Sequence, residues 1–181
     1  MAGLLEAAAS LIADLGYDAV TMSAIAARAG ASIGSLYQFF PQKEAVAQAL
    51  RAQYGQEIVA LWAPLEAEAA TLPLKLLVDR LINIRVDFIY NHPAFLPLLD
   101  VSSTGRAPGM RELLRKRIVR LLRARRPSLP PAKIRLMADV VLQIIKGLLF
   151  MYARATPEAR PGLVEEFKAA LVRYLMPRFG P

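Results

Sequence analysis

The chain divides at its prolines and glycines into segments whose apolar residues recur every three or four positions. Between residues 74 and 90, the apolar positions 74, 77, 78, 81, 82, 86 and 89 form the stripe of a helix that buries one face. No segment alternates apolar and polar residues over a useful length, and no repeat is present. The pattern therefore predicts an all-α fold. The expected helices cover residues 4–15, 22–29, 33–40, 43–62, 74–90, 110–125, 132–153 and 163–175, with a further short apolar segment at 93–101.

Glycine and proline set the predicted helix ends. Gly16 and Gly30 follow the first two helices, where a residue without a side chain readily adopts the left-handed conformation that closes a helix. Pro41 limits the third helix, and Pro93, after His92, limits the fifth. Pro64 is expected to break the fourth helix after residue 62, because an interior proline removes one backbone hydrogen bond.

The composition favours a globular protein that is not an enzyme. Hydrophobic residues make up 55% of the 181 residues and charged residues 21%, which is ample for a packed core. The chain has no cysteine, so disulfides, thiolate metal sites and a cysteine nucleophile are excluded. Its single histidine, His92, precedes a proline at a helix end and is read as a structural cap. We expect no catalytic residue, no metal and no cofactor.

A membrane location is not expected either. The longest nearly apolar stretch, from Leu136 to Tyr152, contains Asp139 and Lys146 and is shorter than the roughly 20 apolar residues of a membrane span. The first ten residues lack the basic region of a secretory signal. The prediction is a cytoplasmic protein without membrane contact.

The charge is strongly basic but unevenly placed. The formal net charge of +8 suggests a polyanionic partner. Residues 1–45, however, hold two basic and four acidic residues, whereas residues 100–126 hold nine basic and two acidic ones. The arginine-rich segment 111–126 has three interpretations: a solvated helix face, which we favour, an anion site for acyl-CoA or another phosphorylated effector, or nonspecific attraction to DNA or anionic lipid. Net charge alone does not locate a nucleic-acid site.

Residues 21–44 carry the functional signal. They predict a short helix, a turn containing Gly30, and a second short helix, which is the layout of a helix-turn-helix. Ile25 and Leu36 are apolar at positions suited to the junction, and Ala26 and Ala29 are small enough for the helices to cross closely. Leu36 and Phe40 are expected in the core.

The second helix of this motif presents residues that suit DNA. Gly34 allows a close approach of the backbone to the duplex, and Ser35 can hydrogen-bond a base edge or a phosphate. Tyr37 has a hydroxyl within phosphate reach, and Phe39 either contacts a thymine methyl or packs. Lys43 lies in the first turn of the following helix, where a cation opposes the helix dipole, so an anion such as a DNA phosphate is expected nearby.

Two stretches resemble a known family. Residues 8–17 (AASLIADLGY) and residues 32–45 (SIGSLYQFFPQKEA) resemble the TetR-type bacterial transcriptional repressors, over about the first 50 residues. The resemblance implies a nine-helix homodimer with an N-terminal three-helix DNA-binding domain (1–45) and a C-terminal ligand-binding and dimerisation domain (46–181). Ligand binding would release the operator, which is double-stranded DNA. By motif position, the implied DNA contacts are Ile33, Gly34, Ser35, Tyr37, Phe39 and Lys43, with Thr21 and Arg28 as weaker phosphate contacts.

The sequence departs from the family at two points. Members usually have a basic arm before the first helix, and here that helix begins almost at Met1. Gln42 stands where Ser or Asn usually caps the fourth helix. Neither departure removes the second helix of the motif.

The second domain offers a pocket and a dimer interface. Helices 132–153 and 163–175 hold more apolar residues than a small domain needs to bury, which predicts a homodimer. The effector is expected to be largely apolar, with or without an anionic group. Gln143 and Lys146 either orient the effector or face the dimer interface. The candidate ligand-binding residues are Trp62, Phe88, Phe95, Leu98, Leu99, Met110, Leu114, Ile118, Met137, Gln143 and Lys146.

One alternative stays open. A helical small-molecule-binding or membrane-surface protein could contain the motif without operator specificity, and selective, salt-sensitive DNA binding would separate the two readings.

Overall fold

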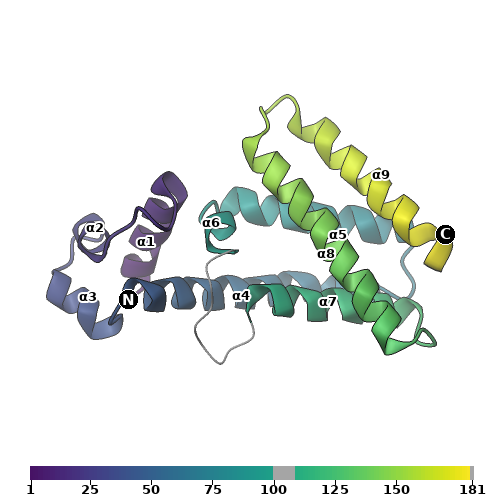
Figure 1. Cartoon of the computed structure of the whole chain (residues 1–181), viewed down its shortest axis with the longest axis horizontal. Helices are drawn as coiled ribbons and strands as arrows, with labels where there is room; N and C mark the ends of the chain where they lie inside the picture. Colours follow the sequence, from purple (N-terminus) through teal and green to yellow (C-terminus); the bar gives the residue numbers. More distant parts are fainter. Residues whose placement is uncertain (100–108, 180–181) are drawn as a thin grey trace. The chain divides into compact units, whose positions relative to one another are not determined.

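The computed structural model describes residues 1–99 and 109–179, and helices are the only regular secondary structure in these two ranges (Figure 1). The all-α prediction is confirmed. The helices are α1 (Ala2–Leu15), α2 (Met22–Arg28), α3 (Ile33–Phe39), α4 (Lys43–Glu68), α5 (Leu74–Asn91), α6 (Phe95–Leu99), α7 (Met110–Arg125), α8 (Pro131–Arg154) and α9 (Arg160–Phe179).

The chain forms two compact units. Unit 1 comprises the described residues of Met1–Glu57 and Ile89–Met110, and unit 2 those of Ile58–Phe88 and Arg111–Pro181. Helices α4 and α5 therefore each contribute residues to both units. The sequence predicted a boundary between a DNA-binding domain (1–45) and a second domain (46–181). It concerns which segments fold independently, and it stays a prediction.

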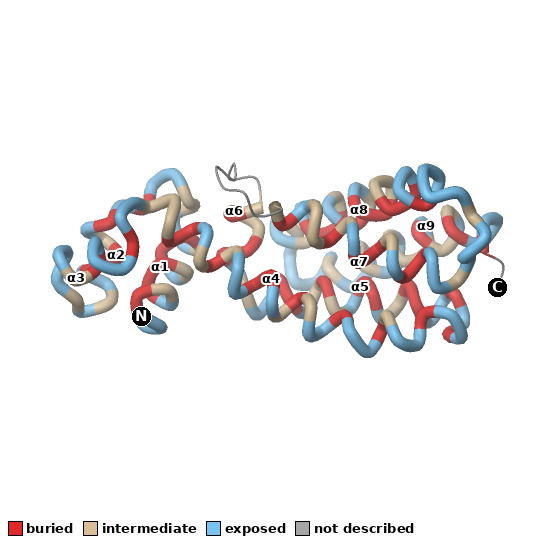
Figure 2. Tube along the Cα trace, turned by 90° about the horizontal axis from the view of Figure 1, so that it is seen from below, coloured by how far each residue is buried: buried red, intermediate tan, exposed pale blue. Residues whose placement is uncertain are grey.

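In unit 1, α1 packs on α2 and α2 packs on α3. The buried residues of α1 recur at helical spacing, so one stripe of this helix faces the interior (Figure 2). Ile25 of α2 and Leu36 of α3 are fully buried, as their apolar character predicts. The packing of α3 on α2 fixes the orientation of α3 within unit 1.

Helix α4 does not end at Pro64, which corrects the prediction that it breaks after residue 62. It continues to Glu68. Pro64 and Ala60, whose carbonyl loses its partner to the proline ring, are both exposed, so water can replace the lost hydrogen bond. On the other side of the helix, Trp62 and Leu65 are almost completely buried. Because Trp62 before Pro64 and Leu65 after it are both packed in the interior, the helix continues through the proline.

In unit 2, α8 packs along α9 (Figure 1). Among the described residues, α8 is the helix long and apolar enough to cross a membrane by length and composition. Core helices share these features, and one side of α8 is indeed interior. Helix α9 begins earlier than predicted, at Arg160, because Pro161 is compatible with a first helical turn. The buried residues of α8 are Ile134, Met137, Ala138, Val141, Leu142, Ile145, Leu148 and Leu149.

The arginine-rich helix α7 is not simply a solvated face. Arg117 is 8% exposed and donates from Nη1 to both carboxylate oxygens of Glu66 at 2.7 Å. Arg125 donates to the backbone oxygens of Ala69 and Leu72, just after α4 ends. These two arginines therefore hold the end of α4 in unit 2, which the sequence interpretations had not included.

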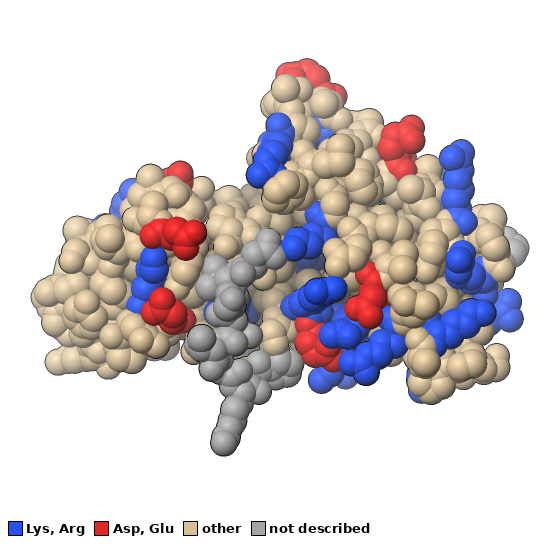
Figure 3. Space-filling view, viewed as in Figure 1, with Lys and Arg blue, Asp and Glu red and all other residues tan. Residues whose placement is uncertain are grey.

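Other cations of this helix remain at the surface. Lys116, Arg123 and Arg126 are exposed, as the favoured interpretation predicts. On the face shown in Figure 3, basic and acidic side chains gather over α7 and the start of α8. Helix α3 of unit 1, by contrast, contains no charged residue.

Candidate DNA-binding interface

Side-chain caps begin both helices of the motif. The Thr21 hydroxyl accepts a hydrogen bond from the backbone nitrogen of Ala24 at 3.2 Å. The Ser32 hydroxyl accepts one from the backbone nitrogen of Ser35 at 3.1 Å. Such caps satisfy backbone donors that have no partner inside the helix. Two seven-residue helices can therefore start at fixed positions.

The turn between the helices depends on Gly30. Its φ of 63° is in the left-handed region, where a side chain would be strained. The next backbone nitrogen, of Ala31, donates to the oxygen of Ala26 at 2.9 Å and closes the end of α2. The capped helices and this turn make residues 21–40 a helix-turn-helix.

Helix α3 exposes large apolar side chains on the side away from the core. Ile33 is 40% exposed, and Tyr37 and Phe39 are each 51% exposed, whereas Leu36 is fully buried. A Cβ atom built on Gly34 would meet no atom within 4 Å, so packing within the protein does not explain the missing side chain. An external partner can approach this backbone closely. The outward positions of Ile33, Gly34, Tyr37 and Phe39 suit the predicted DNA contacts, and Ser35 is half-buried beside them.

Lys43 has partners inside the protein. Its ammonium donates to the backbone oxygens of Tyr17 at 3.0 Å and of Asp18 at 3.1 Å, and it lies 4.5 Å from the centroid of the Tyr17 ring. These contacts explain a lysine in the first turn of α4 without a DNA phosphate. An ammonium has three hydrogens, so one remains for a phosphate. The DNA contact of Lys43 stays a prediction.

Tyr17 anchors the same corner of unit 1. Its hydroxyl donates to Oε1 of Glu44 at 3.4 Å. Burial, followed by the Glu44 carboxylate, raises the pKa of Tyr17. The cluster of Tyr17, Lys43 and Glu44 joins the end of α1 to the start of α4. Tyr17 is 26 positions from Lys43 and 27 from Glu44, a separation that local sequence patterns do not connect.

The two weaker phosphate candidates also have intramolecular roles. Thr21 is the cap of α2, and Arg28 donates from Nη1 to the Ser10 hydroxyl at 2.8 Å. Asp14 lies 3.8 Å from the same nitrogen. Both Thr21 and Arg28 remain exposed. Their phosphate contacts also stay predictions.

The predicted ligand-binding residues belong to both units and differ in burial. Gln143 and Lys146 lie on the exposed side of α8, and Leu99 is half-buried. The residues buried in unit 2 are Trp62, Phe88, Leu114, Ile118 and Met137, whereas Phe95, Leu98 and Met110 are buried in unit 1.

Arg85 of α5 is a buried charged residue of unit 2. It is 2% exposed, and burial lowers its pKa to about 10, so it remains a cation at neutral pH. Its guanidinium carbon lies 5.9 Å from the centroid of the Phe88 ring. Asn83, two residues before Arg85, is exposed, and its side-chain amide donates to Oδ2 of Asp79 at 3.2 Å.

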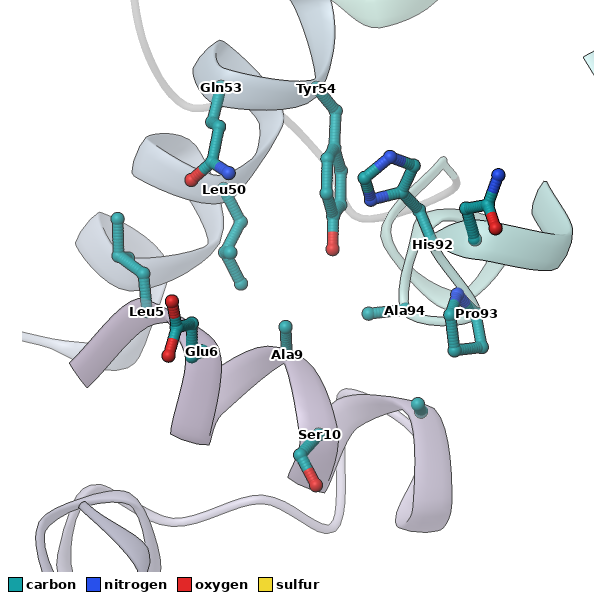
Figure 4. Close-up of a pocket in the computed structure, with 12 residues that line it drawn as sticks. Leu5, Glu6, Ala9, Ser10, Leu50, Gln53, Tyr54, His92, Pro93 and Ala94 are labelled. Carbon is teal, nitrogen blue, oxygen red and sulfur yellow. The ribbon is translucent and has the colours of Figure 1, made fainter. Parts of the chain in front are cut away.

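Two cavities lie elsewhere, and no predicted ligand residue lines them. One, of about 450 Å³, lies in unit 2 at the α8–α9 connection. The other, of about 310 Å³, lies in unit 1 beside α1 (Figure 4). The unit 2 cavity is lined by Val86, Tyr152, Pro157, Arg160, Pro161, Val164 and Glu165. Neither cavity could be read from local periodicity, because each is lined by residues from distant segments.

His92 directly follows the end of α5 at Asn91, where a helix-end cap was predicted, and its side chain has further partners in unit 1. Its Nε2 lies 2.9 Å from Oε2 of Glu57, and its ring lies 5.0 Å from that of Tyr54. It therefore joins the α5–α6 connection to α4 within unit 1. Among the described residues, no group of three or more His, Cys, Asp or Glu side chains could hold a metal ion.

Comparisons of structure show the same fold in several regulators. A TetR-family transcriptional regulator from Streptomyces coelicolor has a TM-score of 0.72, with 23% identity over 96% of both chains. The fatty acid degradation regulator FadR from Bacillus halodurans has a TM-score of 0.70, with 18% identity over 94% of this chain and 97% of that one. The SmeT–triclosan complex has a TM-score of 0.64, with 20% identity over 97% and 90%.

Comparisons of sequence identify the family. No curated protein sequence matches the chain. Residues 4–50, which include the helix-turn-helix, match the bacterial regulatory proteins of the tetR family. Residues 73–175, more than half of the chain, match the tetracyclin repressor-like C-terminal domain. The chain therefore belongs to the TetR family of transcriptional regulators.

Proposed function

We propose that this regulator is a repressor that binds operator DNA as a homodimer and leaves the DNA when a small, largely apolar effector binds. Proteins of this family are DNA-binding regulators rather than enzymes. The observation that carries the proposal is the exposed surface of α3, where Ile33, Tyr37 and Phe39 are exposed and the backbone of Gly34 has open space beside it. Side chains of this kind can contact base edges and thymine methyls in the major groove. A cytoplasmic location is part of the same proposal.

The dimer interface is proposed to include the exposed side of α8. Leu136 and Phe150 are 65% and 52% exposed, and Gln143 lies midway between them at a spacing of seven residues. Residues seven apart share one side of a helix, so Gln143 belongs to this exposed apolar line rather than to an interior pocket. Apolar surface of this kind commonly marks an interface.

Some of the apolar residues of α8 and α9 that predicted a dimer are buried within the chain itself. Val141, Ile145, Leu148 and Leu149 of α8 are almost completely buried, as is Leu171 of α9. These side chains are therefore not available to the proposed interface. A two-fold dimer would place two copies of α3 in successive major grooves, about one helical turn apart.

The effector is proposed to enter the apolar interior of unit 2. Trp62, Phe88 and Met137 supply large buried side chains there, and Arg85 supplies a buried cation for an acidic group. Support comes from two relatives of similar fold: one is a regulator of fatty acid degradation, and the other was solved with triclosan. Release of the operator requires that the effector prefer the conformation that does not bind DNA.

A DNA-binding titration tests the proposal. Fluorescence anisotropy with labelled DNA from beside the gene is compared with a random duplex of equal length, at several salt concentrations. The expected result is selective binding that weakens steeply with salt, because phosphate contacts release counterions. Equal affinity for both duplexes would refute the repressor and support a helical small-molecule-binding protein without operator specificity.

A further inference from the structure

The cavity of unit 1 lies beside the helix that supports the helix-turn-helix (Figure 4). Its volume is about 310 Å³, at the small end of the range for ligand pockets. Three segments line it: α1, α4 and the connection from α5 to α6. All three belong to unit 1, and α1 packs directly on α2.

Small side chains make the space, and aromatic rings form one wall. Ala9 of α1 and Ala94 after α5 both point into the cavity, and Leu50 of α4 adds an apolar surface (Figure 4). The Tyr54 and His92 rings lie 5.0 Å apart at an angle of 57°. The Glu57 carboxylate, 2.9 Å from Nε2 of His92, holds the imidazole in place. The wall is therefore fixed before any ligand arrives.

The charge of the lining favours a cation. Glu6 is the carboxylate among the lining residues, and no lysine or arginine lines the cavity. His92 also lines the cavity, and its Nε2 is directed to the Glu57 carboxylate. Burial, with Glu57 adding to it, raises the pKa of Tyr54, so its hydroxyl stays neutral. A carboxylate and an electron-rich ring both attract a cation.

We propose that this cavity binds a small organic amine that carries one aromatic ring. The ring lies against Tyr54 and His92, and the ammonium group pairs with Glu6. Such a ligand would contact α1, α4 and the α5–α6 connection at once. The proposal does not depend on DNA binding or on an effector in unit 2, because all of the lining residues lie in unit 1.

The chain contains two unique reporters that separate this site from the proposed effector site. His92 is the single histidine, so its imidazole protons give one identifiable set of proton NMR signals. Trp62 is the single tryptophan and is buried in unit 2. A ring current from a bound aromatic ligand shifts the His92 signals, whereas a ligand in the unit 2 interior changes the fluorescence of Trp62.

The experiment titrates the full chain, without DNA, with phenethylamine. We expect a saturable shift of the His92 signals with a dissociation constant on the order of 1 mM, as suits a probe of this size. Glu6→Gln should weaken binding about fivefold, because an exposed ion pair contributes modestly. Glu166→Gln, the same change at another exposed helical glutamate, should leave binding unchanged. Ala9→Leu should abolish the saturable shift by filling the cavity.

A charge-reversed probe completes the test. Phenylpropionate has the same ring with a carboxylate, and it should give no saturable shift of His92. Equal binding of both probes, or equal binding by the Glu6→Gln variant and the parent chain, would overturn the proposal. A change in Trp62 fluorescence with an unmoved His92 signal would also overturn it. Unchanged circular dichroism of each variant confirms that the fold is kept.

Discussion

Replacing Gly34 with alanine should separate the stability of the protein from its affinity for DNA. A Cβ atom at Gly34 would meet nothing within 4 Å, so the folded protein has room for it. Alanine in a helix is favoured over glycine, and in this first turn of α3 we expect a gain of about 0.5 kcal/mol in the free energy of unfolding. The protein should become slightly more stable.

The same methyl group should weaken DNA binding. If the backbone at Gly34 lies against base edges or phosphates, the methyl group occupies that contact distance, and a lost contact of this kind costs about 1–3 kcal/mol. In a homodimer both copies carry the change, so an affinity loss of at least about tenfold is expected. Fluorescence anisotropy measures the affinity, and urea denaturation measures the stability.

Gly162 provides the matched control. It lies in the first turn of α9, and a Cβ atom there would also meet nothing within 4 Å. Gly162→Ala should give a similar stability gain with no change in DNA affinity. The reasoning is refuted if Gly34→Ala keeps full affinity, because α3 would then not approach the duplex through this backbone.

Three further changes test contacts of the described residues. Lys43→Ala removes two hydrogen bonds to backbone oxygens and should lower the free energy of unfolding by about 1 kcal/mol; an unchanged salt slope of DNA binding would show that no phosphate contact was lost. Arg117→Met removes both 2.7 Å hydrogen bonds to the largely buried Glu66 carboxylate, while Arg120 stays 3.7 Å from it, and should cost about 2 kcal/mol in urea denaturation. The double variant with Glu66→Leu should recover most of this loss. Gly147→Ala places a Cβ atom 3.6 Å from the Phe167 ring, an ordinary contact, and should raise stability by about 1 kcal/mol; a loss measured by thermal unfolding would contradict this packing.

The helix-turn-helix was predictable because its determinants are local. Thr21 and Ser32 cap their helices three residues away, and Gly30 closes its turn through its own backbone conformation. Periodicity likewise identified Leu36 as core, because one helical turn decides which side it occupies. These features depend on neighbours in the chain, and the sequence contains all of them.

The tertiary structure decided everything that depends on distant partners. Pro64 was expected to end α4, but burial of Trp62 and Leu65 on the opposite side outweighs one lost hydrogen bond at an exposed carbonyl. The DNA phosphate expected near Lys43 stays a prediction, but the sequence did not show that its ammonium also donates to backbone oxygens 25 and 26 residues earlier in the chain. Local propensity could not weigh these effects, since each depends on which surfaces meet after folding.

Charge and apolar surplus show the same limit. The sequence does not distinguish an arginine of α7 that faces water from one that pairs with a distant carboxylate. Arg117 pairs with Glu66, which lies 51 residues earlier in the chain. The sequence allowed Gln143 to face either an interior pocket or a dimer interface, and the structure places it on the exposed side of α8. The sequence determined the helices and the DNA-binding motif through local hydrogen bonds and periodicity. Long-range packing decided the partners of the charged side chains and of the remaining apolar ones, because packing sets the burial, and hence the energy, of each contact.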